Sequence, residues 1–194
     1  GKRPEMDGLC VPFTIYWPIS DVQKMPSDAA YEKLNTYLRT CGMILFDTRD
    51  ADLGRFGSGT PNGRRLQELA ALLDIPPLEP VPSDHVLTRS FYLLQDFPGR
   101  YAQSDVWVEA APKDATHAKG TPFRNLNDGV SPVVIGGNDW AAAWAQSQGR
   151  GSFAGQRQRE MAYRFGINLV MYVLTGNYKS DQVHVPALLE RLGQ

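Results

Sequence analysis

The strongest constraint on this chain is a short stretch, residues 42–50, that is first apolar and then polar. Residues 43–46 are all apolar and do not alternate with polar residues, which is typical of a strand buried on both faces of a mostly parallel sheet. Four polar residues, Asp47, Thr48, Arg49 and Asp50, follow directly. Ligands of open α/β sheets bind just outside the carboxyl ends of the strands. The stretch therefore predicts both the centre of the sheet and the place of a site.

The segments before this strand predict a strand–helix–strand unit. Residues 13–19 are aromatic and β-branched, as strands are. Ser27 offers an N-cap for a helix whose apolar residues Tyr31, Leu34 and Leu38 share one face. Two strands joined through a helix by short connections indicate a parallel α/β sheet.

The rest of the chain continues in the same way. Short strands are predicted at residues 106–109 and 132–135, and the proline-rich residues 76–82 predict an extended connection. The fold class is therefore α/β, with helices on both faces of a mostly parallel sheet. Residues 1–194 are interpreted as one domain. Residues 84–94 are mixed and favour a short helix that carries His85 and Arg89. Further helices are predicted at residues 64–73, 140–146, 156–174 and 186–192.

Composition excludes several classes of protein. Of the 194 residues, 42% are hydrophobic and 21% are charged, which suits a globular domain with a full core. The formal net charge of −1 gives no reason to expect a nucleic-acid partner. Cys10 and Cys41 have neither metal-ligand spacing nor a disulfide framework, and no apolar run approaches the ~20 residues of a membrane span. Because the chain begins Gly-Lys-Arg, we expect it to be an excised piece of a larger protein.

Polar residues from two segments are the first candidates for a ligand site. Asp47, Arg49 and Asp50 follow the central strand, and His85 and Arg89 lie one helical turn apart in a later predicted helix. Because strand ends tend to meet at one edge of a sheet, we expect the two segments to form one crevice, with arginine keeping Asp47 ionised. Such a cluster would bind an anion or a carboxylate, or act as a general base with its orienting partner. A buried network that fixes the helix to the sheet stays open as the alternative.

A third segment, residues 136–139, follows a strand and opens a helix. Its two glycines would let a ligand approach backbone N–H groups at a helix N-terminus, which places Asn138 and Asp139 on the border of the crevice. Asp139 is equally a simple N-cap, and its charge would repel a phosphate. The aspartates after the central strand lack the later acidic ligand of a calcium loop. We therefore predict neither a metal nor a cofactor.

Six segments spread along the chain are shared with one protein family: residues 16–19, 41–47, 84–94, 97–100, 129–132 with 138–140, and 159–168 with 176–179. On these segments the chain resembles the bacterial DUF4159 family, a domain of unknown function, over nearly its whole length. The resemblance implies a fold similar to class I glutamine amidotransferase-like domains, a flavodoxin-like three-layer sandwich. It also implies a parent protein of the bacterial envelope, anchored by N-terminal membrane helices of the aerotolerance type.

The chain departs from this resemblance at two places. An amidotransferase needs a nucleophilic cysteine on a tight strand-to-helix turn, and no Gly-x-Cys-x-Gly occurs here. Family members usually carry one more strand upstream of residues 13–19, and nothing in this chain matches it. We therefore expect the open edge of the strand at 13–19 to be filled by another chain or by residues 1–10.

Two functions of different class follow. The favoured one is a non-catalytic binding or interaction domain of a membrane-anchored envelope protein. The resemblance implies MoxR-like ATPases or von Willebrand-type proteins as its partners, and leaves open a homo-oligomer and the side of the membrane. The alternative is a hydrolase or small-ligand sensor that uses Asp47, His85 and Arg89. An enzyme would need these side chains to converge in a concave pocket.

Overall fold

The structure is a computed structural model that describes residues 14–40, 42–53, 59–102, 104–111, 130–145 and 153–175. The helix predicted at 186–192, both cysteines and residues 1–10 lie outside this range. Five strands form one sheet in the order β1-β2-β5-β4-β3. Three neighbours, β1, β2 and β5, are parallel, whereas β4 runs antiparallel to both β5 and β3. The strands are β1 (Thr14–Pro18), β2 (Met43–Asp47), β3 (Leu78–Pro80), β4 (Trp107–Glu109) and β5 (Val133–Gly136).

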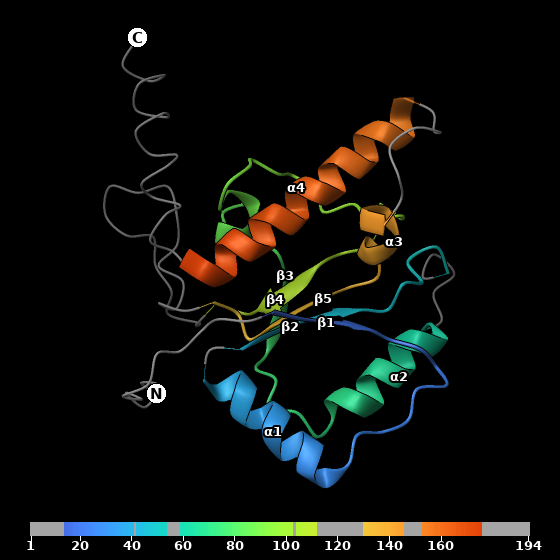
Figure 1. Cartoon of the computed structure of the whole chain (residues 1–194), viewed down its shortest axis with the longest axis vertical. Helices are drawn as coiled ribbons and strands as arrows, with labels where there is room; N and C mark the ends of the chain where they lie inside the picture. Colours follow the sequence, from blue (N-terminus) through green and yellow to red (C-terminus); the bar gives the residue numbers. More distant parts are fainter. Residues whose placement is uncertain are drawn as a thin grey trace.

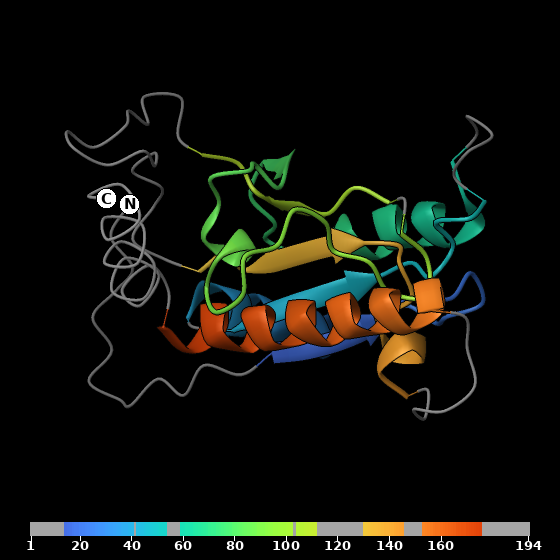
Figure 2. The same ribbon diagram turned by 90° about the horizontal axis from the view of Figure 1, so that it is seen from above.

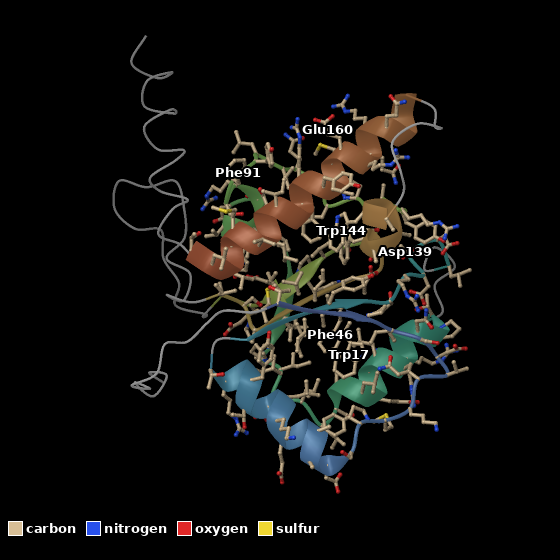
Figure 3. The ribbon with its side chains drawn as sticks, viewed as in Figure 1. Trp17, Phe46, Phe91, Asp139, Trp144 and Glu160 are labelled. Carbon is tan, nitrogen blue, oxygen red and sulfur yellow. The ribbon has the colours of Figure 1, made fainter. Side chains whose placement is uncertain are left out.

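The central strand is β2, as the apolar run predicts. All five of its residues are buried, and it lies between β1 and β5, parallel to both. Met43 and Leu45 pack into the core on one face of the sheet, and Ile44 and Phe46 pack into the core on the other. Figure 3 shows Phe46 beside Trp17 of β1, with their rings 5.5 Å apart. An unbroken apolar run suits this strand because both of its faces are covered.

Helices cover both faces of the sheet and make three layers (Figure 1). On one side lie α1 (Asp28–Arg39) and α2 (Pro61–Ala70), and on the other lie α3 (Trp140–Ala145) and α4 (Phe153–Thr175). The predicted α/β class, flavodoxin-like with a mostly parallel sheet, is confirmed. Ser27 caps α1 as expected, since its hydroxyl accepts a hydrogen bond of 3.3 Å from the N–H of Ala30. Helix α2 begins three residues earlier than predicted because Thr60 caps it in the same way.

The prediction of a short helix within residues 84–94 is wrong. Only a single 3₁₀ turn, η2 (Val86–Thr88), forms there. The His85 ring accepts a hydrogen bond of 3.1 Å from the N–H of Leu87, and the Thr88 hydroxyl donates one of 2.7 Å to the carbonyl of His85. These local side-chain bonds compete with helix propagation. His85 and Arg89 consequently flank a turn as its two caps and do not share a helix face.

The proline-rich connection at residues 76–82 contains a strand that its composition does not predict. Residues Leu78–Pro80 pair antiparallel with β4 at the far edge of the sheet. Proline is tolerated at a sheet edge because no outer strand needs its missing N–H. The carboxylate of Glu79 fixes this edge by accepting a hydrogen bond of 2.9 Å from the N–H of Ala111.

The longest helix, α4, holds the segment that follows η2. Asn168 is fully buried, and its amide donates hydrogen bonds of 2.9 Å to the carbonyls of Leu87 and Tyr92. Its carbonyl oxygen accepts one of 2.7 Å from the N–H of Tyr92. The side chain is therefore a satisfied core amide that ties α4 to a loop. Among the described helices, α4 included, none has the length and apolar character needed to span a bilayer.

Candidate functional site at the carboxyl edge of the sheet

Asp47, the last residue of β2, is fully buried at the predicted edge of the sheet. One carboxylate oxygen accepts hydrogen bonds of 3.1 Å from the backbone N–H groups of Arg49 and Asp139. The other oxygen accepts a hydrogen bond of 2.9 Å from the N–H of Trp140 and one of 2.8 Å from the hydroxyl of Tyr16. Each oxygen thus receives two hydrogen bonds, which uses the acceptor capacity of an ionised carboxylate.

The protonation states of Asp47 and Tyr16 follow from their burial and from the hydrogen bond between them. Burial raises the pKa of the Asp47 carboxyl above its ordinary value, and the hydrogen bond from Tyr16 and the three backbone N–H groups oppose that rise. Burial also raises the pKa of Tyr16, and the neighbouring Asp47 raises it further, so that its hydroxyl stays a donor. The expected arginine partner is not observed. The guanidinium of Arg49 donates instead to the carbonyl of Ile19, at 2.8 Å.

Asp47 acts as the cap of α3 from a distant part of the sequence. The N–H groups that it accepts belong to Trp140, the first residue of α3, and to Asp139 before it. Asp139 has a positive φ of 52°, and its own carboxylate lies 3.6 Å from the guanidinium of Arg100. The capping side chain is therefore Asp47, where the sequence suggested Asp139. A carboxylate at this place is stabilised by the partial positive charge of the helix end.

Asn138 and its preceding glycines form the other side of the same edge. Asn138 is buried. Its side-chain amide donates a hydrogen bond of 3.0 Å to the carbonyl of Phe97 and accepts one of 3.1 Å from the N–H of Ser104. A Cβ at Gly137 would lie 2.8 Å from the hydroxyl of Thr48, and a Cβ at Gly136 would overlap the indole of Trp140. These glycines thus permit close packing of the chain on itself, where the sequence suggested the approach of a ligand.

The other two predicted site residues lie elsewhere. The His85 ring packs against the ring of Tyr172 at 5.4 Å, and the Tyr172 hydroxyl accepts a hydrogen bond from the N–H of Ser131, before the start of β5. Arg89 lines a separate hollow of about 570 Å³ against α4. Figure 3 shows Phe91, two residues after Arg89, toward the left of the view, whereas Asp139 lies toward the right. The structure therefore joins Asp47, Arg49, Asp50, Asn138 and Asp139 and leaves His85 and Arg89 apart. Whether either group binds a ligand stays a prediction.

The family profile described as "Domain of unknown function (DUF4159)" matches residues 4–174 of this chain. The chain belongs to the DUF4159 family. None of the curated proteins matches it. The arrangement of side chains in this DUF4159 domain must therefore carry the functional argument.

Asp50 differs from the other acidic residues that the structure of this DUF4159 domain describes. Its side chain is 6% exposed, and its Oδ2 atom has no hydrogen-bond partner in the part of the chain that the structure describes. It lies beside Gly137, whose carbonyl accepts a hydrogen bond of 3.0 Å from the N–H of the next residue, Ala51. No cluster of three or more His, Cys, Asp and Glu side chains suited to a metal ion occurs among the described residues.

Sequence reasoning missed one feature of the DUF4159 domain, an apolar groove beside Tyr16. The groove has a volume of about 460 Å³ and lies between β1 and α4. Tyr16 lines it and packs edge-on against Trp144 at 5.8 Å. The alternation of β1 contains the signal, since Tyr16 lies on the α4 face and Trp17 on the other, but the sequence alone does not show that β1 is an edge strand. The remaining lining comes from Thr14, Leu45, Tyr163, Gly166, Ile167, Leu169, Val170 and Met171.

Proposed function

We propose that this DUF4159 domain is a non-catalytic interaction domain of a membrane-anchored bacterial envelope protein. The observation that supports the proposal is the bonding of Asp47, in which each carboxylate oxygen already accepts two internal hydrogen bonds. A general base must direct a free lone pair at the proton that it abstracts. Asp47 instead holds the start of α3 against the end of β2.

The hydrolase alternative is less well supported by the same geometry. It requires the carboxylate, the imidazole and the guanidinium to converge around one substrate position. The imidazole of His85 packs against Tyr172, and Arg89 lines a different hollow. A cysteine nucleophile on a strand-to-helix turn is also absent from the sequence.

The surface of the domain supports an interaction role. Several large apolar side chains of α4 are exposed, among them Val170 at 52% and Leu174 at 57%. Contiguous exposed apolar surface marks interaction sites in soluble domains. We propose MoxR-like ATPases or von Willebrand-type proteins as partners, with the membrane reached through helices of the parent protein.

Deleting the domain from the parent protein in cells tests this proposal. Chemical cross-linking followed by mass spectrometry should lose the links to an ATPase or von Willebrand-type partner, while the parent protein stays in the membrane fraction. An unchanged set of partners would contradict the proposal. So would a substrate turnover that the Asp47→Asn variant loses while its unfolding midpoint stays that of the wild type.

A further inference from the structure

A hollow of about 570 Å³ lies between α4 and the segment that carries η2. Three arginines line it, Arg89 from the segment and Arg157 and Arg164 from α4. Asp96 is the one acidic residue among the described residues of its lining. We call it the arginine hollow, and its volume falls within the range of about 300–1,000 Å³ that is typical of small-molecule sites.

Buried hydrogen bonds hold the two walls of the arginine hollow together. Figure 2 shows the green segment around η2 running alongside α4. The side chain of Asn168 in α4 bonds to Leu87 and Tyr92, and the hydroxyl of Ser90 donates a hydrogen bond of 2.7 Å to the backbone carbonyl of Asn168. Arg89 lies between these anchored residues in the sequence. The hollow is therefore preformed, so that little free energy is lost in ordering it when a ligand binds.

The residues that α4 contributes to the arginine hollow share one face of the helix. Arg157, Met161 and Arg164 follow one another at intervals of four and three residues. Asn168, four residues farther on, continues the row and bonds to the opposite wall. This face therefore points toward the segment that carries η2, and both arginines of α4 lie along one side of the hollow.

The charges of the arginine hollow favour an anion. Arg157 is exposed, and neither Arg157 nor Asp96 forms an ion pair with any residue that the structure describes. The guanidinium of Arg164 lies 5.0 Å from the centre of the Tyr92 ring and binds Glu160 through Nη2, which fixes its place and leaves its other N–H groups for a ligand. Guanidinium N–H groups match the paired oxygens of a carboxylate or phosphate. The three arginines outnumber Asp96 and Glu160, so the net charge around the hollow is positive.

We propose that the arginine hollow binds a small organic anion through a carboxylate or phosphate group. Arg157 and Arg164 bind its oxygens from α4, and the positive charge of Arg89 on the opposite wall strengthens the attraction. This site lies apart from Asp47 and needs none of the residues at the carboxyl edge of the sheet.

Apolar side chains of the arginine hollow indicate the kind of anion. Leu93 is 64% exposed, and it lines the hollow together with Leu94 and Met161. An inorganic anion would leave this apolar surface in contact with water, whereas a ligand with an aromatic ring would cover it. We therefore expect an oxyanion that is attached to a compact apolar group.

Isothermal titration calorimetry of the 194-residue chain with phenyl phosphate, phenylacetate and inorganic phosphate tests the inference. Phenyl phosphate or phenylacetate should bind, and the tighter of the two identifies the preferred oxyanion. Arg157→Gln should raise its dissociation constant about tenfold, because a hydrogen bond to a charged group contributes about that much. Arg39→Gln is the matched control, since Arg39 is exposed, pairs with Asp74 and belongs to α1 on the other side of the sheet from α4 (Figure 1). Circular dichroism should show both variants folded.

Leu93→Ser tests the apolar part of the site separately. It should raise the dissociation constant of the tighter aromatic probe severalfold, and inorganic phosphate should bind the wild type more weakly than that probe. The absence of binding by all three probes at millimolar concentration, or binding that Arg157→Gln weakens no more than Arg39→Gln does, would overturn the inference. An unchanged affinity of the aromatic probe in Leu93→Ser would overturn it too. The cellular deletion experiment can still succeed in each of these cases, so the two proposals fail independently.

Discussion

The carboxylate of Asp47 caps helix α3 by accepting a hydrogen bond of 2.9 Å from the N–H of Trp140, which lies 93 residues later in the chain. The bond joins the end of the central strand to the start of the helix that follows the neighbouring parallel strand. In open α/β sheets, ligands bind at the carboxyl ends of the strands. Here the polar residue at that position holds two elements of the fold together.

Replacing Asp47 with alanine should strongly destabilise the domain. The change leaves the buried N–H groups of Asp139 and Trp140 and the hydroxyl of Tyr16 without their acceptor. Each unsatisfied buried donor costs about 1–3 kcal/mol, so the three donors together predict a loss of about 3–9 kcal/mol in urea unfolding. Asp74→Ala is the control, because its ion pair with Arg39 is solvent-exposed and surface pairs contribute about 0–1 kcal/mol. Equal losses for the two variants would contradict the capping role.

The raised pKa of Asp47 predicts a specific dependence of stability on pH. Between the ordinary value of 3.8 and the higher value in the folded protein, the native state holds a proton that the unfolded chain has released. The contribution of this group to the free energy of unfolding therefore decreases as the pH rises through that interval. Urea midpoints measured at a series of pH values should show this slope in the wild type and lose it in Asp47→Asn. An identical slope in both proteins would assign it to other groups.

The sequence predicted the fold well where one physical signal dominated. The unbroken apolar residues of β2 required burial on both faces, and the structure provides it. The helix at residues 84–94 failed because helical spacing says nothing about local competition from side chains such as those of His85 and Thr88. Strand β3 was not predicted because it forms only through pairing with β4, a tertiary contact that the local sequence does not indicate.

The sequence indicated which edge of the sheet the polar residues share, but it did not indicate correctly which side chains meet there. The polar residues after β2 and β5 do meet at one edge, as parallel neighbours must. Tyr16 was missed because its role depends on a hydroxyl reaching across to the next strand, which no spacing reveals. His85 and Arg89 were included because they were expected to follow a strand end. Instead, they belong to a segment that α4 holds through Asn168.

Gly136→Ala should destabilise the domain by overpacking. A Cβ at this position would overlap the indole of Trp140, which is fully buried and cannot move aside. Overpacking of a well-packed core costs about 1–3 kcal/mol, and we expect a loss of this size in thermal and urea unfolding. Gly59→Ala is the matched control, because a Cβ there would meet no atom within 4 Å. A Gly136→Ala variant as stable as this control would refute the packing role of the glycine.

Asn168→Asp should destabilise the domain in a manner that acid partly reverses. The new carboxylate would face the carbonyls of Leu87 and Tyr92 in a fully buried place, so the neutral acid is favoured and its pKa rises. We expect a loss of about 3–5 kcal/mol at neutral pH, which shrinks as the pH falls and the protonated acid regains a donor. Asn35→Asp, whose hydrogen bonds are exposed, should show a small loss. A loss in Asn168→Asp that is independent of pH would contradict this account.

A double-mutant cycle between Asp47 and His85 tests whether the two residues form one cluster. Asp47 accepts its hydrogen bonds at the carboxyl end of β2, whereas His85 contacts Tyr172, whose hydroxyl binds Ser131 before the start of β5. Residues that share no partner have effects on stability that add to within about 0.5 kcal/mol. The losses of Asp47→Ala and His85→Ala should therefore sum to that of the double variant in urea unfolding. Tyr16→Phe combined with Asp47→Ala is the positive control, because these side chains bond directly and should couple. Coupling of similar size in both cycles would restore the single crevice and, with it, the case for a catalytic site.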